Sequence, residues 1–323
     1  MIRILVFGYG NLGRAVCSRL SSVNDMALQG VCTRRAEQLN ATGLSVPFFS
    51  DAQLDTLRPD IDVVINCGGS ARDLPRTTAR LAGHFCVVDS FDTHAAIPEH
   101  FAAVDTAARS GGTLCVVSAG WDPGLFSLMR SYGAAFLPEA QIATFWGPGI
   151  SQGHSDALRQ LPGVLDARQY TIPSPDALAA ARSGGKVPHT YHCHRRVCYV
   201  VPKVDADLLL LEHTIRTMPG YFAGYEVEIH FVTAEELKAH HDRLPHGGHV
   251  ICTTPKNSAP QQFTELRLQL SSNPDFTAGI LIACARAAFH LHRKGERGCR
   301  TMLDIPPALY HARDAASLRA GLL

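Results

Sequence analysis

Over the first 120 residues, short uninterrupted apolar runs alternate with segments of helical periodicity. Apolar runs without polar alternation are typical of strands buried on both faces of a parallel sheet. The strands expected on this basis are residues 4–7, 28–32, 63–67, 85–88 and 114–117. The helices expected between them are residues 12–20, 52–57, 74–81 and 97–108. This alternation predicts right-handed β-α-β units and a Rossmann-type, doubly wound parallel sheet in an α/β fold.

Beyond Met129 the pattern changes, because the strand candidates are separated mostly by loops and single helices. Strands are expected at 142–146, 164–172, 197–201, 226–232, 249–253 and 265–270. Helices are expected at 155–160, 176–182, 206–216, 235–241, 275–294 and 312–322. This pattern predicts an α+β domain with an open mixed or antiparallel sheet. We expect a first domain at 1–122, on which 295–323 packs back, and a second at 123–294.

The first strand is followed at once by a glycine-rich turn, Gly8-Tyr-Gly-Asn-Leu-Gly13. Gly8 permits the tight reversal, Gly10 lets the backbone approach a pyrophosphate, and Gly13 lets the next helix lie close to the strand. Free amide groups at the helix start near Asn11 then face the anion. An ordinary glycine turn is the alternative, but the position between a first strand and an amphipathic helix favours dinucleotide binding.

The second expected strand ends in Thr33-Arg34-Arg35. An acidic residue about 20 residues past the glycine turn normally holds the ribose 2′-hydroxyl of NAD, and none is present here. Two arginines supply planar donors for a 2′-phosphate instead, because the guanidinium geometry matches phosphate oxygens. A solvated arginine pair is the alternative. The placement at a strand end favours NADP as the cofactor.

Polar side chains and glycines also follow the next three strands. These segments are Asn66-Cys-Gly-Gly-Ser70, Asp89-Ser-Phe-Asp92 and Ser118-Ala-Gly-Trp-Asp-Pro-Gly124. Ligands of doubly wound sheets bind outside the carboxyl ends of the strands, so we expect these groups at one rim. Asp89 and Asp122 also suit the capping of a following helix, which does not exclude a role in binding.

Composition and charge exclude several classes of protein. The net formal charge is +1, the isoelectric point is about 7.7 and the mean hydropathy is +0.01, which does not support a role on nucleic acid or a membrane surface. Residues 278–285 form an apolar helix too short to span a bilayer. The ten cysteines are scattered, which indicates buried free thiols, and the chain opens directly on a strand. We therefore expect a cytoplasmic protein.

Two groups of histidines raise the question of a metal site. His189, His192 and His194 cluster near two cysteines, and His246 and His249 flank Gly247-Gly248. Two glycines between histidines indicate a turn rather than a helix face with two ligands, and no Cys-x-x-Cys occurs. We therefore expect surface or substrate-contacting histidines and no metal.

Eight motifs together carry a resemblance to a known family. They are Gly8-Tyr-Gly-Asn-Leu-Gly13, Ser118-Ala-Gly-Trp-Asp-Pro-Gly124, Phe145-Trp-Gly-Pro-Gly149, Ser151-Gln-Gly-His-Ser-Asp-Ala-Leu158, Arg216-Thr-Met-Pro219, Gly224-Tyr-Glu-Val227, Pro245-His-Gly-Gly-His249 and Asn273-Pro-Asp-Phe-Thr277. In this order they closely resemble the meso-diaminopimelate D-dehydrogenases. The resemblance runs from the first strand to near residue 290.

The resemblance implies an NADP-dependent homodimer of diaminopimelate and lysine metabolism. Such an enzyme reversibly oxidises the D-centre of meso-2,6-diaminopimelate (meso-DAP) to L-2-amino-6-oxopimelate and ammonia, and some members reductively aminate 2-oxo acids to D-amino acids. The first domain would bind the dinucleotide, and the second would bind substrate and dimerise. Cofactor contacts are expected from Gly8, Tyr9, Gly10, Asn11, Leu12, Gly13, Thr33, Arg34, Arg35, Cys67, Gly68, Gly69, Ser70, Ser90, Phe91, Asp92, Ala119, Gly120, Trp121, Asp122 and Pro123. Substrate contacts are expected from Asp92, Asp122, Trp146, Gln152, Gly153, Thr171, Arg196, His246 and Asn273.

The chemistry of these residues agrees with what the resemblance implies. The substrate carries two ammonium and two carboxylate groups, so its site needs both signs of charge. Asp92 and Asp122 suit the reacting amino end, where a carboxylate accepts a proton before the hydride leaves, and we do not choose between them. Arg196 suits a carboxylate, and its neighbour Arg195 is the alternative, because the arginine pair leaves the register of the match open by one residue. Thr171, His246 and Asn273 complete the distal end, and Trp146 supplies an apolar wall or core packing.

Some assignments keep an alternative. Asp156 suits either a supporting position near the substrate or the start of a helix. Two other functions are weighed against the dehydrogenase: an NADP-linked reductase of the dihydrodipicolinate or homoserine branch, and a catalytically silent NADP-binding sensor. The presence of two rim carboxylates with Arg196, His246 and Asn273 disfavours the silent protein, and fold alone does not separate the three.

Overall fold

The computed structural model describes all residues from 1 to 323, and the chain divides into two compact units. The first unit contains both chain ends, residues 1–128 and 274–323, and the second unit is the segment between them, residues 129–273. Helices α6 (Leu125–Phe136) and α11 (Asn273–Arg293) run across the two boundaries. The division differs from the expected boundaries at 122 and 294, chiefly because α11 belongs with the first unit.

The first unit is built on a seven-stranded parallel sheet with the strand order β14-β6-β5-β4-β1-β2-β3. The order reverses between β1 and β4, which is the point where doubly wound sheets bind ligands. The strands are β1 (Ile2–Phe7), β2 (Met26–Cys32), β3 (Phe48–Phe49), β4 (Val63–Asn66), β5 (Cys86–Asp89), β6 (Leu114–Val116) and β14 (Gly298–Arg300). The remaining helices of this unit are α1 (Asn11–Leu20), α2 (Ala36–Asn40), α3 (Leu54–Leu57), α4 (Leu74–Ala82), α5 (Ile97–Gly111) and α12 (Ala315–Leu322).

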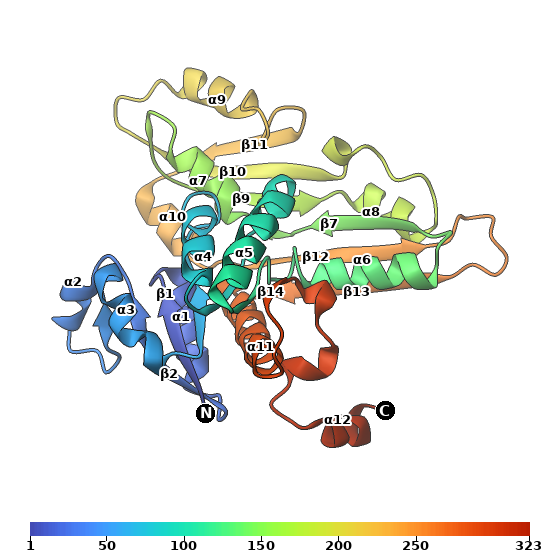
Figure 1. Cartoon of the computed structure of the whole chain (residues 1–323). Helices are drawn as coiled ribbons and strands as arrows, with labels where there is room; N and C mark the ends of the chain where they lie inside the picture. Colours follow the sequence, from blue (N-terminus) through green and yellow to red (C-terminus); the bar gives the residue numbers. More distant parts are fainter. The chain divides into compact units, whose positions relative to one another are not determined.

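Two apolar cores lie on opposite faces of this sheet. Alternate residues of β1 divide between them, since Ile4 and Val6 enter one core and Leu5 enters the other. Helices α1 and α11 supply the first core, and α4 and α5 supply the second (Figure 1). A strand buried on both faces needs apolar residues throughout, which explains the uninterrupted apolar runs and confirms the predicted doubly wound sheet.

The second unit contains a mixed four-stranded sheet, β11-β10-β9-β8, and an antiparallel three-stranded sheet, β13-β12-β7. The predicted α+β class is confirmed. Its strands are β7 (Gln141–Trp146), β8 (Gly149–Ile150), β9 (Val164–Pro173), β10 (His194–Pro202), β11 (Glu226–Phe231), β12 (His246–Thr253) and β13 (Phe263–Leu270). Its helices are α7 (Gln152–Arg159), α8 (Pro175–Arg182), α9 (Leu208–Arg216) and α10 (Ala234–His241).

Several short elements and one long one were not predicted. Strands β3, β8 and β14 have only two or three residues each, too few to show a periodicity. The sequence pattern does not predict helix α6, because this helix crosses the change of pattern at Met129. The segment around Gly247-Gly248 was predicted as a turn, and this was wrong: His246 opens strand β12, and every residue of the strand is buried.

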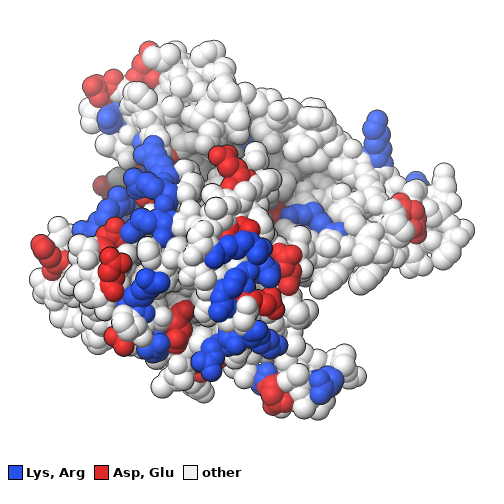
Figure 2. All heavy atoms as spheres, viewed as in Figure 1, with Lys and Arg blue, Asp and Glu red and all other residues white.

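Surface charge is mixed. On the face shown in Figure 2, basic and acidic side chains are interspersed, in keeping with the net formal charge of +1. None of the helices combines the length and the apolar character that a bilayer crossing requires.

Candidate functional site

The turn between β1 and α1 uses its three glycines for different reasons. Gly8 has a φ of +97°, a conformation that L side chains rarely adopt. A Cβ on Gly13 would lie 2.1 Å from the carbonyl oxygen of Gly8, so helix and turn require this close approach. A Cβ on Gly10 would meet no protein atom within 4 Å, so nothing inside the protein explains this glycine.

The first turn of α1 is open to an anion. Gly10 is the N-cap, no side chain caps the helix, and the first turn holds no acidic residue. The amides at this end therefore keep their donor capacity, and the helix dipole favours negative charge there. The open side of Gly10 and the uncapped helix start together fit the pyrophosphate of a dinucleotide.

The arginine pair at the end of β2 lies beside the same turn. Arg34 and Arg35 are both exposed, and Thr33 is half-buried. The Arg35 Nη2 donates to the backbone oxygen of Tyr9 at 3.1 Å, which joins two motifs separated by 26 residues in the chain. A cation at this position suits a phosphate on the adenosine ribose.

The loops after β4 and β5 are connected by one hydrogen bond at the sheet rim. The backbone amide of Asp92 donates to Ser70 Oγ at 2.9 Å. The Cβ that Gly8 lacks would lie 3.1 Å from the carbonyl oxygen of Cys67, so the loop after β4 also borders the glycine turn. The structure thus brings together the expected cofactor residues that follow β1, β2, β4 and β5.

The loop after β6 presents Trp121 and Asp122. The Trp121 indole is buried and meets Phe126 edge-on, with ring centroids 5.2 Å apart, and Asp122 is half-buried. Gly124 closes this loop with a φ of +127°, and a Cβ there would lie 1.9 Å from the carbonyl oxygen of Gly120. The loop has one tight form that only glycine allows, and Trp121 and Asp122 occupy fixed places in it.

In the second unit, Thr171 and Arg196 face each other across the β9–β10 ladder. Directly opposed residues of an antiparallel pair project on the same face, and the Arg196 Nη1 donates to Thr171 Oγ1. Arg195 is exposed instead and forms an ion pair with Glu228 at 2.9 Å. Of the two neighbouring arginines, Arg196 is therefore the one with a sheltered position.

Arg196 is a buried cation without an acidic partner. Arg196 is only 8% exposed. Its Nε has no hydrogen-bond partner, and no carboxylate forms an ion pair with its guanidinium. The Tyr225 ring lies 4.2 Å from the guanidinium, a cation–π contact. Burial lowers the pKa of Arg196, because water no longer stabilises the charge. Such a group needs an anion, and the protein does not provide one.

Three imidazoles of the second unit, those of His154, His194 and His246, are held in the neutral form because burial lowers each pKa. Burial lowers the pKa of His154 to about 3, with the charges of Arg196 and His246 adding to the effect. Burial also lowers the pKa of His246 to about 4. The same cause, with Arg196, lowers the pKa of His194 to about 4, and the unprotonated His194 Nε2 accepts the Trp146 backbone amide at 2.9 Å. Tyr225 and His194 were not predicted site residues; Tyr225 lies in a family motif, but only the ladder places it at Arg196.

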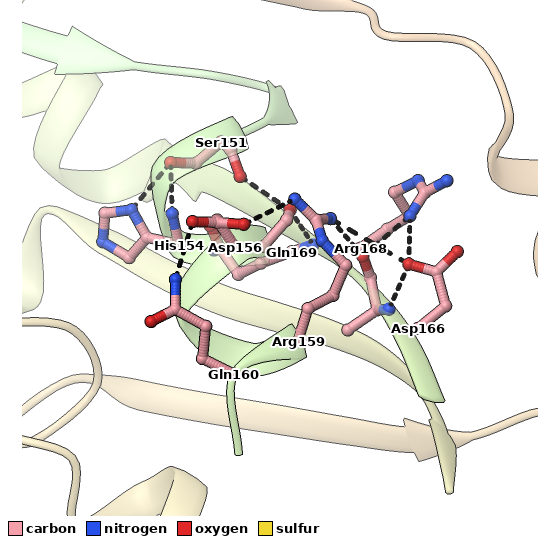
Figure 3. Close-up of polar contacts among 10 residues, drawn as sticks. Ser151, His154, Asp156, Arg159, Gln160, Asp166, Arg168 and Gln169 are labelled. Atoms are coloured by element: carbon pink, nitrogen blue, oxygen red, sulfur yellow. Dashed lines mark hydrogen bonds and ion pairs between the residues drawn. The ribbon is translucent and has the colours of Figure 1, made fainter. Parts of the chain in front are cut away.

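Helix α7 carries Gln152 and Gly153 in its first turn, where both are exposed. Ser151 caps the helix through the His154 amide, and the hydroxyl lies 2.7 Å from His154 Nδ1 (Figure 3). Ser155 Oγ accepts the Gln169 amide at 2.9 Å, which ties α7 to β9. Asp156 lies one turn inside α7, contacts Arg159 and Gln160 and caps nothing, so its interpretation as a helix start is wrong, whereas its supporting position near the substrate stays a prediction.

His246 and Asn273 begin two different elements. His246 is 8% exposed at the start of β12, and its Nδ1 accepts the Gly247 amide at 2.8 Å. Asn273 is half-buried at the start of α11, and its backbone amide donates to the Leu244 carbonyl at 2.9 Å. No three His, Cys, Asp or Glu side chains come together in a way that would hold a metal ion.

Comparisons with known proteins give a consistent result. Residues 120–272 match the family model of the diaminopimelic acid dehydrogenase C-terminal domain. The meso-diaminopimelate D-dehydrogenase of Ureibacillus thermosphaericus is 45% identical over 323 residues, which cover 100% of this chain and 99% of that protein. The enzyme of the same name from Corynebacterium glutamicum is 46% identical over 309 residues, 95% of each chain.

Two solved structures extend the likeness to three dimensions. The Corynebacterium glutamicum DAP dehydrogenase in complex with DAP has a TM-score of 0.95 and 43% identity, and covers 100% of this chain and 99% of that chain. An engineered D-amino acid dehydrogenase bound to NADP+ has a TM-score of 0.91 and 42% identity over the same shares.

Proposed function

Because the chain belongs to the meso-diaminopimelate D-dehydrogenase family, we propose that it oxidises the D-centre of meso-DAP with NADP+. The reaction consumes one water and yields L-2-amino-6-oxopimelate, ammonium, NADPH and a proton. The observation that carries the proposal from this chain's own residues is Arg196, a buried cation that lacks an anion. A substrate carboxylate supplies that anion.

The residues of the first unit fit an NADP molecule. The uncapped start of α1 and the open side of Gly10 suit the pyrophosphate, and Arg34 and Arg35 suit the 2′-phosphate. The loops at 67–70, 90–92 and 119–123 would border the nicotinamide end. When bound, the nicotinamide accepts the hydride from the D-centre. This assignment is supported by the engineered relative that binds NADP+.

The second unit would hold the distal end of the substrate. Arg196 and Thr171 share one face of the sheet, where they would bind a carboxylate through charged and neutral donors. His246 and His154, both uncharged, add polar contacts without repelling the distal ammonium. Gln152, Gly153 and Asn273 would complete this end, and Trp146 would provide an apolar wall. The relative solved in complex with DAP supports the assignment.

The reacting amino group must lose a proton before the hydride leaves, because the nitrogen lone pair drives C–H cleavage. Asp92 and Asp122 are the candidate acceptors, and both stay candidates. Water then adds to the resulting imine on the substrate, and ammonia departs. The role of the two carboxylates is therefore to hold the ammonium and to take its proton at one Oδ.

The stereochemistry of turnover tests the proposed function. Purified protein is assayed for NADP+ reduction with meso-, LL- and DD-diaminopimelate. We expect turnover with the meso form and no turnover with the LL form, because only the meso and DD forms have a D-centre. A reductase of the dihydrodipicolinate or homoserine branch, or a silent NADP-binding sensor, would reduce no NADP+ with any of the three, which would contradict the proposal.

Reductive amination of other 2-oxo acids to D-amino acids is a second activity of the same site. It is supported by the similarity to an engineered D-amino acid dehydrogenase. Assays with NADPH, ammonium and a series of 2-oxo acids measure its breadth. We expect weak turnover, because a substrate without a distal carboxylate leaves Arg196 unpaired.

The protein is further inferred to be a cytoplasmic homodimer. Leu165, Val204, Leu209 and Leu210 are 60–107% exposed in the second unit, and exposed large apolar side chains support an interface with a second copy. All ten cysteines are free thiols, which suits a reducing compartment. Light scattering tests the oligomeric state, and a stable monomer would contradict the dimer.

A further inference from the structure

One buried carboxylate connects the two rim loops that carry Asp92 and Asp122. Asp89, the last residue of β5, is fully buried. Its Oδ1 accepts the backbone amides of Phe91 at 3.1 Å and Ser118 at 2.9 Å. Its own backbone oxygen accepts the Ala119 amide at 2.9 Å. The start of each rim loop is therefore hydrogen-bonded to the same residue.

The other oxygen of Asp89 is held from the helices behind the rim. Thr78 of α4 donates to Oδ2 through its hydroxyl at 2.8 Å, and His100 of α5 contacts Oδ2 through Nε2 at 2.7 Å. The imidazole of His100 stacks on Phe91 with ring centroids 4.2 Å apart. Two side chains from two helices thus determine the orientation of the carboxylate, and one of them also packs on the loop that it anchors.

The conformation of the second loop depends on this carboxylate. Ser118 has a φ of +54°, the one residue other than glycine with a positive φ. This left-handed conformation is unfavourable for a residue with a Cβ, so it persists only where its surroundings impose it. The hydrogen bond from the Ser118 amide to Asp89 imposes this conformation on Ser118. The chain changes direction at Ser118 and continues into Ala119-Gly-Trp-Asp122.

We propose that Asp89 and His100 are positioning residues for the proposed dehydrogenase reaction, which hold the loops of Asp92 and Asp122 in the reactive arrangement. Neither residue needs to touch substrate or cofactor, because both are buried behind the rim. The inference rests on the proposed function for its kinetic consequence. Its structural part, the anchoring of the two loops, is measurable without turnover.

The main test replaces His100 with Phe, which keeps the stacking on Phe91 and removes the donor to Asp89. His100→Gln restores a donor near the position of Nε2 and is the rescue variant. Thr78→Val removes the second donor at nearly constant volume. His84→Phe is the matched control, because His84 is an exposed histidine before the opposite end of β5.

The kinetic readouts are kcat for meso-DAP, the Kd of NADP+, and the deuterium isotope effect with substrate labelled at the D-centre. His100→Phe is expected to lower kcat about tenfold to a hundredfold, since small displacements of reacting groups have effects of that size. The isotope effect should rise, because hydride transfer becomes slower. His100→Gln should recover most of kcat, Thr78→Val should lose less than His100→Phe, and His84→Phe should match the wild type.

The direct readout is amide hydrogen exchange at Phe91 and Ser118, with thermal unfolding measured in parallel. Exchange at both amides should accelerate in His100→Phe and Thr78→Val and stay unchanged in His84→Phe. A lower melting temperature with unchanged kcat, isotope effect and exchange would show a purely structural role and overturn the proposal. If wild-type protein does not oxidise meso-DAP, the proposed function fails, and the exchange result still decides whether Asp89 anchors the loops.

Discussion

The two units prepare their candidate ligand groups by different means. In the first unit, backbone and loops at the ends of parallel strands form the proposed cofactor side, with Gly8 and Gly10 in one turn. In the second unit, side chains on facing ladder positions form the proposed substrate side, with Thr171 opposite Arg196. The difference shows that a turn motif can be recognised from consecutive residues of the sequence. A site formed by side chains on two paired strands can be recognised only when the register of the strands is known.

The largest expected effect tests the ladder site. Arg196→Met should lower kcat/KM for meso-DAP roughly 10²–10³-fold, because loss of one partner of a buried charge pair costs about 2–5 kcal/mol. The Kd of NADP+ should not change, since Arg196 belongs to the other unit. Arg195→Met is the control, because its exposed ion pair with Glu228 is of little energetic value. Equal losses in the two variants would contradict the assignment of Arg196.

The rim carboxylates test the loops of the first unit. Asp122→Asn and Asp92→Asn keep the shape of the side chain and remove its basicity. The variant that has lost the proton acceptor should lose about 10²–10⁴ in kcat, with NADP+ affinity little altered. Steady-state kinetics with cofactor titration measures both. A kcat near the wild-type value for Asp122→Asn would remove its role as the base, and the same holds for Asp92.

The arginine pair tests cofactor choice. Replacing Arg34 and Arg35 together by Ala should weaken NADP+ at least about tenfold more than NAD+, because a hydrogen bond to a charged group contributes about 1.5–3 kcal/mol. Isothermal titration with both cofactors measures the ratio. Equal losses for NAD+ and NADP+ would contradict a 2′-phosphate contact.

The smallest expected effect concerns acid stability of the second unit. His194 and His246 have pKa values lowered to about 4, whereas a histidine in the unfolded chain titrates near 6.5. In the folded protein both histidines are neutral, and their contribution to the unfolding free energy is fully present above about pH 6.5. This contribution is lost as the pH falls toward 4. Each should reduce the unfolding free energy by about 1–2 kcal/mol between pH 7 and pH 5.

The two tryptophans allow the units to be followed separately. Trp121→Phe leaves Trp146 as a reporter of the second unit, and Trp146→Phe leaves Trp121 as a reporter of the first. Urea midpoints should fall with acid more steeply for the Trp146 reporter, and His246→Asn should reduce the slope. A Trp146 midpoint that is the same at pH 5 and pH 7 would contradict the neutral buried histidines.

Much of the first unit was predictable because its rules are local. The strands β1, β2, β4, β5 and β6 are apolar runs in the sequence, and the glycine turn is recognised from six consecutive residues. The affiliation of α11 was not predictable, because its apolar residues show that it is a core helix without showing which core it enters. Strand β14 has three residues, and only its pairing with β6 identifies it.

The candidate site was predictable through motifs more than through periodicity. The pairing of Arg196 with Thr171, the exposure of Arg195 and the contact with Tyr225 required the β9–β10 register. Gly247-Gly248 misled because paired glycines usually mark turns; here a Cβ on Gly247 would lie 2.3 Å from the Leu268 carbonyl oxygen, so close strand packing requires it. The sequence predicts Asp89 as a helix cap or a binding group at the rim, and not as an anchor of two loops, since residues 11 and 29 positions distant supply its partners.

The first unit is completed by a segment that follows the whole second unit in the chain. Helix α11 enters its core, and β14 adds the strand beyond β6, so these parts leave the ribosome after the whole second unit. During synthesis the glycine turn emerges before the second unit, yet its sheet stays one strand and one helix short until residues 273–300 have been translated. A premature stop after residue 273 would therefore damage the first unit, the proposed nucleotide-binding half, while sparing the sequence of the second.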